Sequence, residues 1–316
     1  MHVSLVGSEM CIRDRLYIAL AFLLVLLSKS AIAQQDPHYT QYMYNQAVLN
    51  PAYAGTKENL EITMLYRNQW TGLEGAPDTF TFSGHTPVGD KVGVGLSVIA
   101  DKIGPVKENN IYADFSYRLS LGGNHTLAFG LKGGITLHDI ALADVALIDP
   151  NDPLFAQNVN SSTFNVGAGA FFYSDNYYVG LSIPNFLSGV HLDENGNQFG
   201  SETQHYFVTA GYVFQANENI KIKPSFMVKS AFDAPTSFDI NANFLFYDKF
   251  EIGGSYRLED SFSGMVNFAF TPNIKLGYAY DHIVSDLSVV ANASHEVFLQ
   301  FDLNFPRKVS RSPRFF

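Results

Sequence analysis

Residues 127–137 read LAFGLKGGITL, and this stretch decides the fold class. Leucine, phenylalanine or isoleucine stands at every second position except one, and alanine, glycine, lysine or threonine stands between them. Successive side chains of a β-strand point to opposite faces, so the alternation predicts a strand with one apolar face and one small or polar face. The same pattern recurs in residues 91–100, 236–247 and 294–305.

Fourteen segments with this alternation follow residue 58. Most are 9–12 residues long, which suits a tilted strand that crosses a bilayer. The predicted strands span residues 59–67, 78–86, 91–100, 109–119, 124–137, 162–173, 176–184, 203–214, 219–229, 236–247, 249–257, 261–270, 273–282 and 294–305.

The predicted connections alternate in length. The short ones centre on residues 88–90, 121–123, 174–176, 216–218, 248 and 271–273. Most of the others are longer, including 138–161, 185–202 and 283–293, with shorter exceptions at 230–235 and 258–260. Outer-membrane barrels are built this way, with turns on the periplasmic side and loops outside. An even strand count then predicts that both termini are periplasmic.

The composition distinguishes a membrane barrel from a soluble β-sandwich. Charged residues make up 16% of the chain and aromatic residues 14%, whereas soluble domains carry about 25% charged residues. A sandwich would place charges on its outward face, but here the non-apolar face is rich in glycine and small polar residues. In lipid the apolar face needs no second sheet. We predict an all-β fold, a 14-stranded antiparallel transmembrane outer-membrane β-barrel over residues 59–305.

The N-terminal region resembles an export signal. Residues 16–27 read LYIALAFLLVLL, follow two arginines and precede Ala31-Ile32-Ala33. This predicts a signal peptide over residues 1–33, too short for a membrane span. We interpret residues 1–15 as non-native sequence, because they include Glu9 and Asp14 where a basic region is expected and resemble a translated sequencing-adapter junction. Cys11, the only cysteine, lies there, so a mature chain from Gln34 would have no disulfide or cysteine-based site.

Residues 34–58 are polar, precede the first predicted strand and could fill the barrel. A short helix is expected up to Asn50, where the following proline disfavours further helix. The hypothesis is a plug that seals the lumen; a periplasmic arm under the barrel is the alternative. Residues 306–316 form a predicted periplasmic tail. The candidate plug residues are Gln41, Tyr42, Met43, Asn45, Asn50, Pro51, Ala52 and Gly55.

The sequence shows little sign of catalysis. The histidines are scattered without metal-ligand spacing, and residues 193–204 imitate a calcium loop but end in Gln204 instead of glutamate. We therefore expect no enzymatic activity, no cofactor and no metal. The net charge of −10 argues against nucleic acid as a partner.

The predicted outer loops carry apolar residues, which can mark a partner surface. Packing within the loops is the alternative, and an aromatic-girdle position is the alternative for the tryptophan. Glycines within the strands are expected mainly to relieve crowding or allow bends, and the alternative is that they let a plug or a bound peptide approach the inner wall. The candidate partner surface comprises Trp70, Leu147, Leu154, Phe155, Val190, Val284 and Leu287.

Three stretches carry a family resemblance. They are QYMYNQAVLNPAYAGT (41–56), YRNQWTGLEGAPDTFTFSGHTPV (66–88) and the terminal SPRFF (312–316). In these the chain resembles the PorP/SprF family, outer-membrane proteins of the type IX secretion and gliding apparatus of Bacteroidota. The resemblance runs from about Gln35 to the C-terminus.

The resemblance implies a non-enzymatic barrel that helps secrete large proteins bearing a C-terminal sorting domain, or attach them to the surface. Its implied partners are that cargo, periplasmic and outer-membrane components of the secretion system, and the lipid bilayer. Two alternatives stay open. One is a channel for hydrophobic small molecules, similar to fatty-acid transporters, which share the strand number and an Asn-Pro-Ala. The other is a structural anchor for the periplasmic secretion ring.

Overall fold

The computed structural model describes residues 37–144, 157–187, 190–194, 197–201, 204–231 and 234–303. The predicted signal peptide, the C-terminal tail and three candidate loop residues lie outside these ranges: Leu147, Leu154 and Phe155. No helix within the described ranges is long and apolar enough to cross a membrane.

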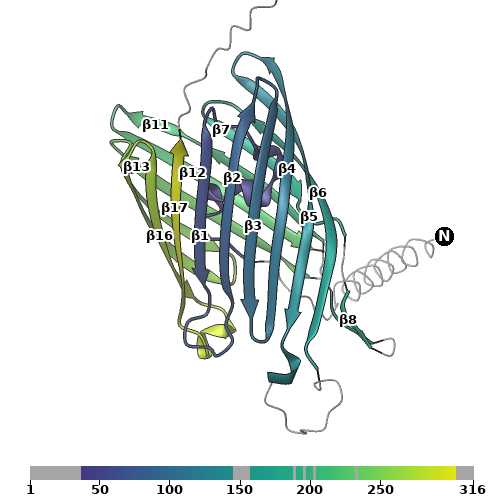
Figure 1. Ribbon diagram of the computed structural model, residues 1–316. Helices are drawn as coiled ribbons and strands as arrows, with labels where there is room; N and C mark the ends of the chain where they lie inside the picture. The colour runs from purple at the N-terminus through teal and green to yellow at the C-terminus, as the bar shows by residue number, and fades with distance from the viewer. Residues whose placement is uncertain are drawn as a thin grey trace, which may run out of the picture.

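The chain forms a closed antiparallel barrel (Figure 1). Neighbouring strands in the sequence are neighbours in the wall, and β1 pairs with β17 to close the ring. The strands are β1 (Leu60–Asn68), β2 (Asp78–Val88), β3 (Val92–Ile103), β4 (Val106–Gly122), β5 (His125–Ile140), β6 (Val159–Tyr173), β7 (Tyr177–Ile183), β8 (Val190–Glu194), β9 (Asn197–Ser201), β10 (His205–Tyr212), β11 (Phe214–Asn217), β12 (Ile220–Ala231), β13 (Ala234–Phe246), β14 (Phe250–Arg257), β15 (Ser261–Thr271), β16 (Ile274–Ile283) and β17 (Ala293–Leu303).

The wall contains fourteen strands, as predicted. β10 and β11 both pair with β12 on either side of Val213, so they count as one wall strand. β8 and β9 pair only with each other and form a separate hairpin. The alternation did not predict this hairpin, which lies in the stretch 185–202 that we expected to be a loop.

One connection is much shorter than expected. β3 and β4 extend until Ile103 pairs with Val106, which leaves a tight turn at Gly104-Pro105. Gly104 has φ +55°, a left-handed conformation that glycine adopts without a Cβ penalty. The prediction of a loop between residues 100 and 109 is therefore wrong. The two strands stay paired up to the turn, which Gly104 makes possible.

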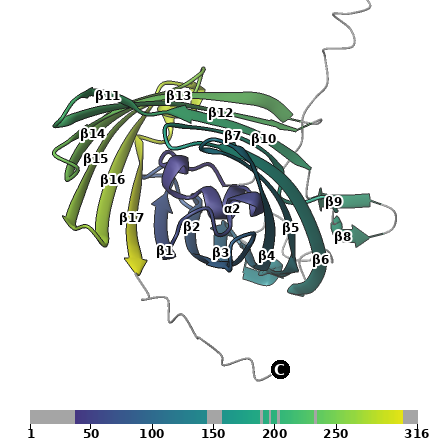
Figure 2. The same ribbon diagram turned by 90° about the horizontal axis from the view of Figure 1, so that it is seen from above.

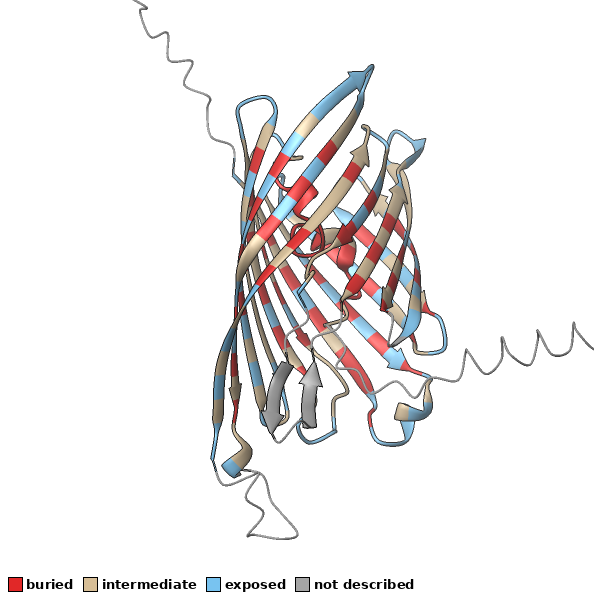
Figure 3. Cartoon of the chain, turned by 90° about the vertical axis from the view of Figure 1, so that its right-hand side faces the viewer, coloured by how far each residue is buried: buried red, intermediate tan, exposed pale blue. Residues whose placement is uncertain are grey.

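The two faces of the wall follow the alternation (Figure 3). In β5, Phe129 and Leu131 are 50% and 64% exposed, whereas Lys132 and Thr136 are buried in the interior. Along the barrel, large apolar side chains point outward, where a bilayer would cover them. The predicted membrane-barrel pattern is confirmed.

The N-terminal residues fold inside the barrel as short helical pieces (Figure 2). These are η1 (Tyr42–Tyr44), α2 (Gln46–Leu49) and η2 (Pro51–Tyr53). Asn50 ends α2 in an extended conformation and accepts a hydrogen bond from the amide of Ala52 at 2.9 Å, so it caps η2. The helix therefore stops at Asn50, as expected, but Asn45 also interrupts it.

Candidate functional site: the lumenal segment and the two mouths

Residues 37–56, here called the lumenal segment, cross the interior of the barrel. Thr40 contacts Asp281 and Glu296, near the ends of β16 and β17 that carry the 284–292 loop. Gly55 contacts His85 and Arg118, near the opposite ends of β2 and β4. We call these openings the loop mouth and the turn mouth.

This path places the two ends of the described chain at different mouths. The first described residues lie at the loop mouth, where His38 lines a pocket with residues of the loop-side strand ends. The described chain ends at Leu303, which pairs with Leu60 at the turn mouth. The strand ends of β1 and β17 share one mouth, as an even strand number requires, but the described chain begins at the other mouth. We expected the segment to enter from the same side as the C-terminus.

At the loop mouth, a buried ionic cluster holds the segment. Arg67 pairs with Asp281 at 2.7 Å and with Glu296 at 3.1 Å, and all three side chains are at most 2% exposed. The backbone amides of Thr40 and Gln41 donate to the two oxygens of Glu296 at 2.9 and 2.7 Å. The Thr40 hydroxyl donates to Asp281 at 2.8 Å. The segment thus supplies donors that these buried carboxylates need.

In the middle of the lumen, the wall satisfies the carbonyl groups that the short helix α2 leaves without partners. Lys132 donates to the carbonyl of Val48 at 2.9 Å, and Ser182 donates to the carbonyl of Leu49 at 2.8 Å. The last carbonyls of a helix have no intrahelical donor. The wall therefore stabilises a helix of four residues that would not form by itself.

Two tyrosines anchor the segment to the other side of the wall. Tyr42 donates its hydroxyl to Ser225 at 3.1 Å, and Tyr44 donates to Glu251, which also binds Lys223. Burial raises the pKa of both hydroxyls above the ordinary value, and the charge of Glu251 raises that of Tyr44 further. Both side chains therefore stay protonated and remain donors.

Near the turn mouth, wall glycines form a seat for the segment. A Cβ on Gly130 would lie 2.1 Å from the Ala52 nitrogen, and one on Gly93 would lie 2.0 Å from the Ala54 oxygen. A Cβ on Gly169 would lie 2.1 Å from Oδ1 of Asn50. These three glycines match the alternative expectation, because they let the backbone and side chains of the segment approach the inner wall.

All eight candidate plug residues lie inside the barrel. Seven are buried and Met43 is partly buried. The prediction missed Thr40 and Val48. Val48 contacts the wall through its backbone carbonyl, and Thr40 through its backbone amide and its hydroxyl. The backbone contacts leave no mark on residue type, whereas the Thr40 hydroxyl is a signal that the sequence does carry.

The candidate loop surface is brought together only in part. The amide of Trp70 donates to Ser294 at 3.1 Å and that of Thr71 to the carbonyl of Ala293 at 2.7 Å, so the 69–77 loop packs on the start of β17. The amide of Val284 donates to the carbonyl of Asp260 at 2.9 Å. This hydrogen bond links the 284–292 loop to a third connection, the one between β14 and β15. Trp70 and Leu287 are partly buried, and nothing is described of the Val190 side chain.

These three connections expose an apolar surface that we call the loop-mouth patch. It includes Val289, 86% exposed, and Val290, 54% exposed, which the prediction missed although both neighbour Leu287. The sequence could have indicated them, since Val289-Val290 is an apolar pair within a loop. The patch comprises Leu73, Leu258, Val284, Val289 and Val290.

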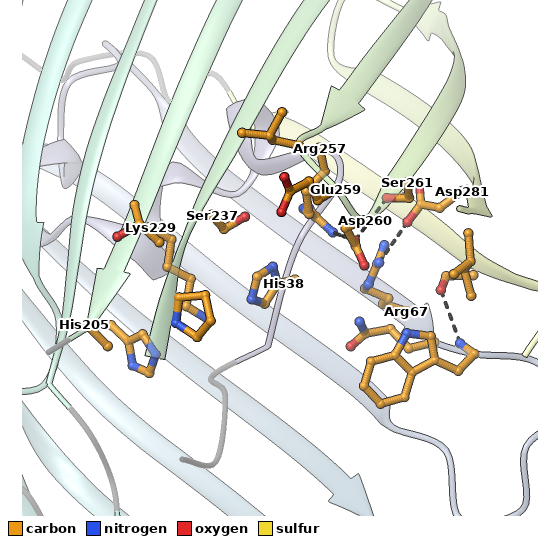
Figure 4. A pocket seen from close by; sticks show the side chains of 18 residues that line it. His38, Arg67, His205, Lys229, Ser237, Arg257, Glu259, Asp260, Ser261 and Asp281 are labelled. Carbon is orange, nitrogen blue, oxygen red and sulfur yellow. Dashed lines mark hydrogen bonds and ion pairs between the residues drawn. The ribbon is translucent and has the colours of Figure 1, made fainter. Parts of the chain in front are cut away.

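A cavity of about 290 Å³ opens beside the patch (Figure 4). His38, Lys229 and His205 lie on one side, and Arg67 and Arg257 with their carboxylate partners lie on the other. Burial lowers the pKa of His38, and the charges of Lys229, Arg257 and Arg67 lower it further. The described residues contain no group of three histidine, cysteine or acidic side chains placed to hold a metal.

The chain matches a family described as "Type IX secretion system membrane protein PorP/SprF" over residues 31–301. It belongs to this family. The PorP/SprF match includes the whole lumenal segment and almost the whole barrel. The predicted family is thus confirmed, and the protein is a membrane component of a type IX secretion system.

Solved barrels resemble this PorP/SprF protein at low identity. A FadL homologue from Pseudomonas aeruginosa is 11% identical, with a TM-score of 0.47, and the match covers 81% of this chain and 93% of that one. The toluene transporter TbuX of Ralstonia pickettii is 11% identical, with a TM-score of 0.49, and the match covers 81% and 92%. The CymD monoaromatic hydrocarbon channel is 13% identical, with a TM-score of 0.49, and the match covers 82% and 93%. No curated protein matches the chain.

Proposed function

We propose that this barrel aids the secretion or surface attachment of large proteins with a C-terminal sorting domain, and that it does so through its loop-mouth surface, without enzymatic activity. The observation that supports this most directly is the lumenal segment, which is hydrogen-bonded to the wall from one mouth to the other. A barrel whose lumen is occupied in this way is better suited to bind partners on its surface than to let solutes pass through it.

The polar lumen argues against a channel for hydrophobic small molecules. The inner wall carries buried ionisable side chains, including Arg67, Glu296 and Lys132. An apolar solute gains nothing by leaving lipid for such an interior, and it would have to separate buried ion pairs from their partners. The barrel therefore suits a protein partner better than a hydrocarbon.

We infer the usual orientation of outer-membrane barrels, with the loop mouth outside and the turn mouth in the periplasm. In this orientation Leu303 lies at the periplasmic mouth and His38 lies at the outer mouth.

The proposal is tested by purifying an affinity-tagged barrel from outer membranes and identifying what it retains. We expect a large secreted protein with a C-terminal sorting domain, and about tenfold less of it for the double variant Val289→Asp, Val290→Asp. Leu121→Asp is the matched control, because Leu121 is 58% exposed near the end of β4, at the opposite mouth. Equal recovery from all three forms would contradict the role of the patch.

Loss of the gene separates the alternatives. A carrier predicts lost secretion with normal uptake of fatty acids and hydrocarbons. Lost uptake with intact secretion would support the channel. Recovery of periplasmic partners without surface cargo would support the structural anchor.

A further inference from the structure

A second cavity, of about 800 Å³, lies at the turn mouth. It lies between the lumenal segment and the turn-side ends of β6, β7, β10, β12 and β16. Pockets of 300–1,000 Å³ with a few placed polar groups are typical ligand sites. We call it the turn-mouth cavity, and it shares no lining residue with the pocket at the loop mouth.

Aromatic rings form one side of the turn-mouth cavity. Phe171 stacks on Tyr178 with centroids 5.3 Å apart and meets Tyr53 edge-on at 5.4 Å. Tyr177 and Tyr212 are nearly parallel, with an interplanar angle of 4°. Such flat faces accept planar or apolar groups of a ligand.

Three lysines, Lys57, Lys223 and Lys275, line the cavity together with Glu61. Lys223 pairs with Glu251 at 2.8 Å. Among the described residues, no carboxylate lies within 4.0 Å of the amino groups of Lys57 or Lys275. The amino group of Lys275 lies over the face of the Tyr44 ring, 4.7 Å from its centroid. Two ammonium groups are thus placed to bind negative charge from outside the chain.

Two residues that line the cavity, Asn243 and Gln300, carry side-chain oxygens that lack a hydrogen-bond donor among the described residues. Asn243 uses its amide nitrogen on Glu251, and Gln300 uses its own on Glu61. Their side-chain oxygens are buried and accept no hydrogen bond from the described part of the chain. A buried acceptor without a donor costs about 1–3 kcal/mol, so a ligand whose N–H groups can reach these two oxygens is favoured.

We propose that the turn-mouth cavity binds an acidic peptide segment of a partner protein. Peptide amides supply N–H donors for Asn243 and Gln300, acidic side chains pair with Lys57 and Lys275, and aromatic side chains stack on the tyrosines. A fatty or aromatic acid has the carboxylate but lacks the row of N–H groups. This proposal rests on the proposed function in one respect: the inferred orientation of the barrel decides whether the partner is periplasmic. The binding itself does not depend on that function.

The test is direct binding to the purified full-length barrel in detergent, which requires no working secretion system. The probe is a fluorescent five-residue peptide, capped at both ends, of alternating aspartate and phenylalanine. We expect saturable binding, weakened about tenfold by Lys275→Gln and by Lys57→Gln, since a charge-assisted hydrogen bond contributes about 1.5–3 kcal/mol. Lys275→Arg keeps the charge and should retain most of the affinity. Lys91→Gln, exposed at the same mouth outside the cavity, should bind like the wild type.

Three results would overturn the proposal. The first is equal affinity for a peptide with lysine in place of aspartate. The second is unchanged binding by both glutamine variants. The third is equally tight binding of decanoate or benzoate, which would assign the site to free acids. Copurification of cargo is a separate measurement, so failure here leaves the proposed function standing.

Discussion

At the loop mouth the lumenal segment is held by charge, whereas at the turn mouth it is held by close packing. Thr40 and Gln41 bind carboxylates that are themselves paired with Arg67. Ala52 and Ala54 instead lie against Gly130 and Gly93, where a single added methyl group would clash. The first attachment depends on ionisation, and the second depends on the absence of a side chain. Changes of charge and changes of volume should therefore release different ends.

The largest effect is expected from removing both attachments. Deleting residues 37–56 should give larger single-channel conductance in planar bilayers than the full-length barrel, because a fourteen-strand barrel is wide enough to leak unless it is filled. Conductance equal to that of the full-length protein would contradict the seal.

Breaking the charged attachment comes next. Arg67→Leu leaves Asp281 and Glu296 buried without their cation, which should destabilise the protein by about 3–5 kcal/mol. Urea unfolding followed by circular dichroism measures this. Lys102→Leu, exposed near the loop-side end of β3, is the control and should change stability by no more than about 0.5 kcal/mol. Similar losses for both variants would show that the cluster has no special role.

Filling the glycine seat should have a smaller effect. Gly130→Ala places a methyl group against Ala52 and should destabilise the protein by about 1–3 kcal/mol and raise conductance. Gly133→Ala is the matched control on the same strand, because nothing lies within 4 Å of its Cβ position. If Gly133→Ala raised conductance as much, the seat would not explain the result.

The smallest effect is expected from pH at the loop mouth. The lowered pKa of His38 means that a seated segment keeps the histidine neutral while a released one protonates near pH 6.5. Stability of the seated form should therefore be complete above that pH and fall below it, by at most about 1.4 kcal/mol per pH unit. His38→Gln should remove this part of the pH dependence. Unfolding midpoints of both forms between pH 5 and 8 measure the difference.

The alternation predicted the wall because the period of a strand is local and the lipid imposes it on every segment. It did not predict the hairpin of β8 and β9 or the turn at Gly104, where no bilayer enforces one apolar face. The plug motif was recognised by residue type, but Val48 binds the wall through its backbone carbonyl and Thr40 binds it partly through its backbone amide. Gly130 and Gly133 look alike in the sequence, but only Gly130 has the lumenal segment packed against it.

The sequence by itself determined the barrel, its strand number, its outward face and the family, because all of these depend on patterns within single segments. Only the tertiary structure decided that the lumenal segment crosses from the loop mouth to the turn mouth. It alone brought Arg67 of β1 against Asp281 and Glu296 of β16 and β17, at the other end of the chain. Such contacts form only when the barrel closes, and closure leaves no periodic pattern in the sequence.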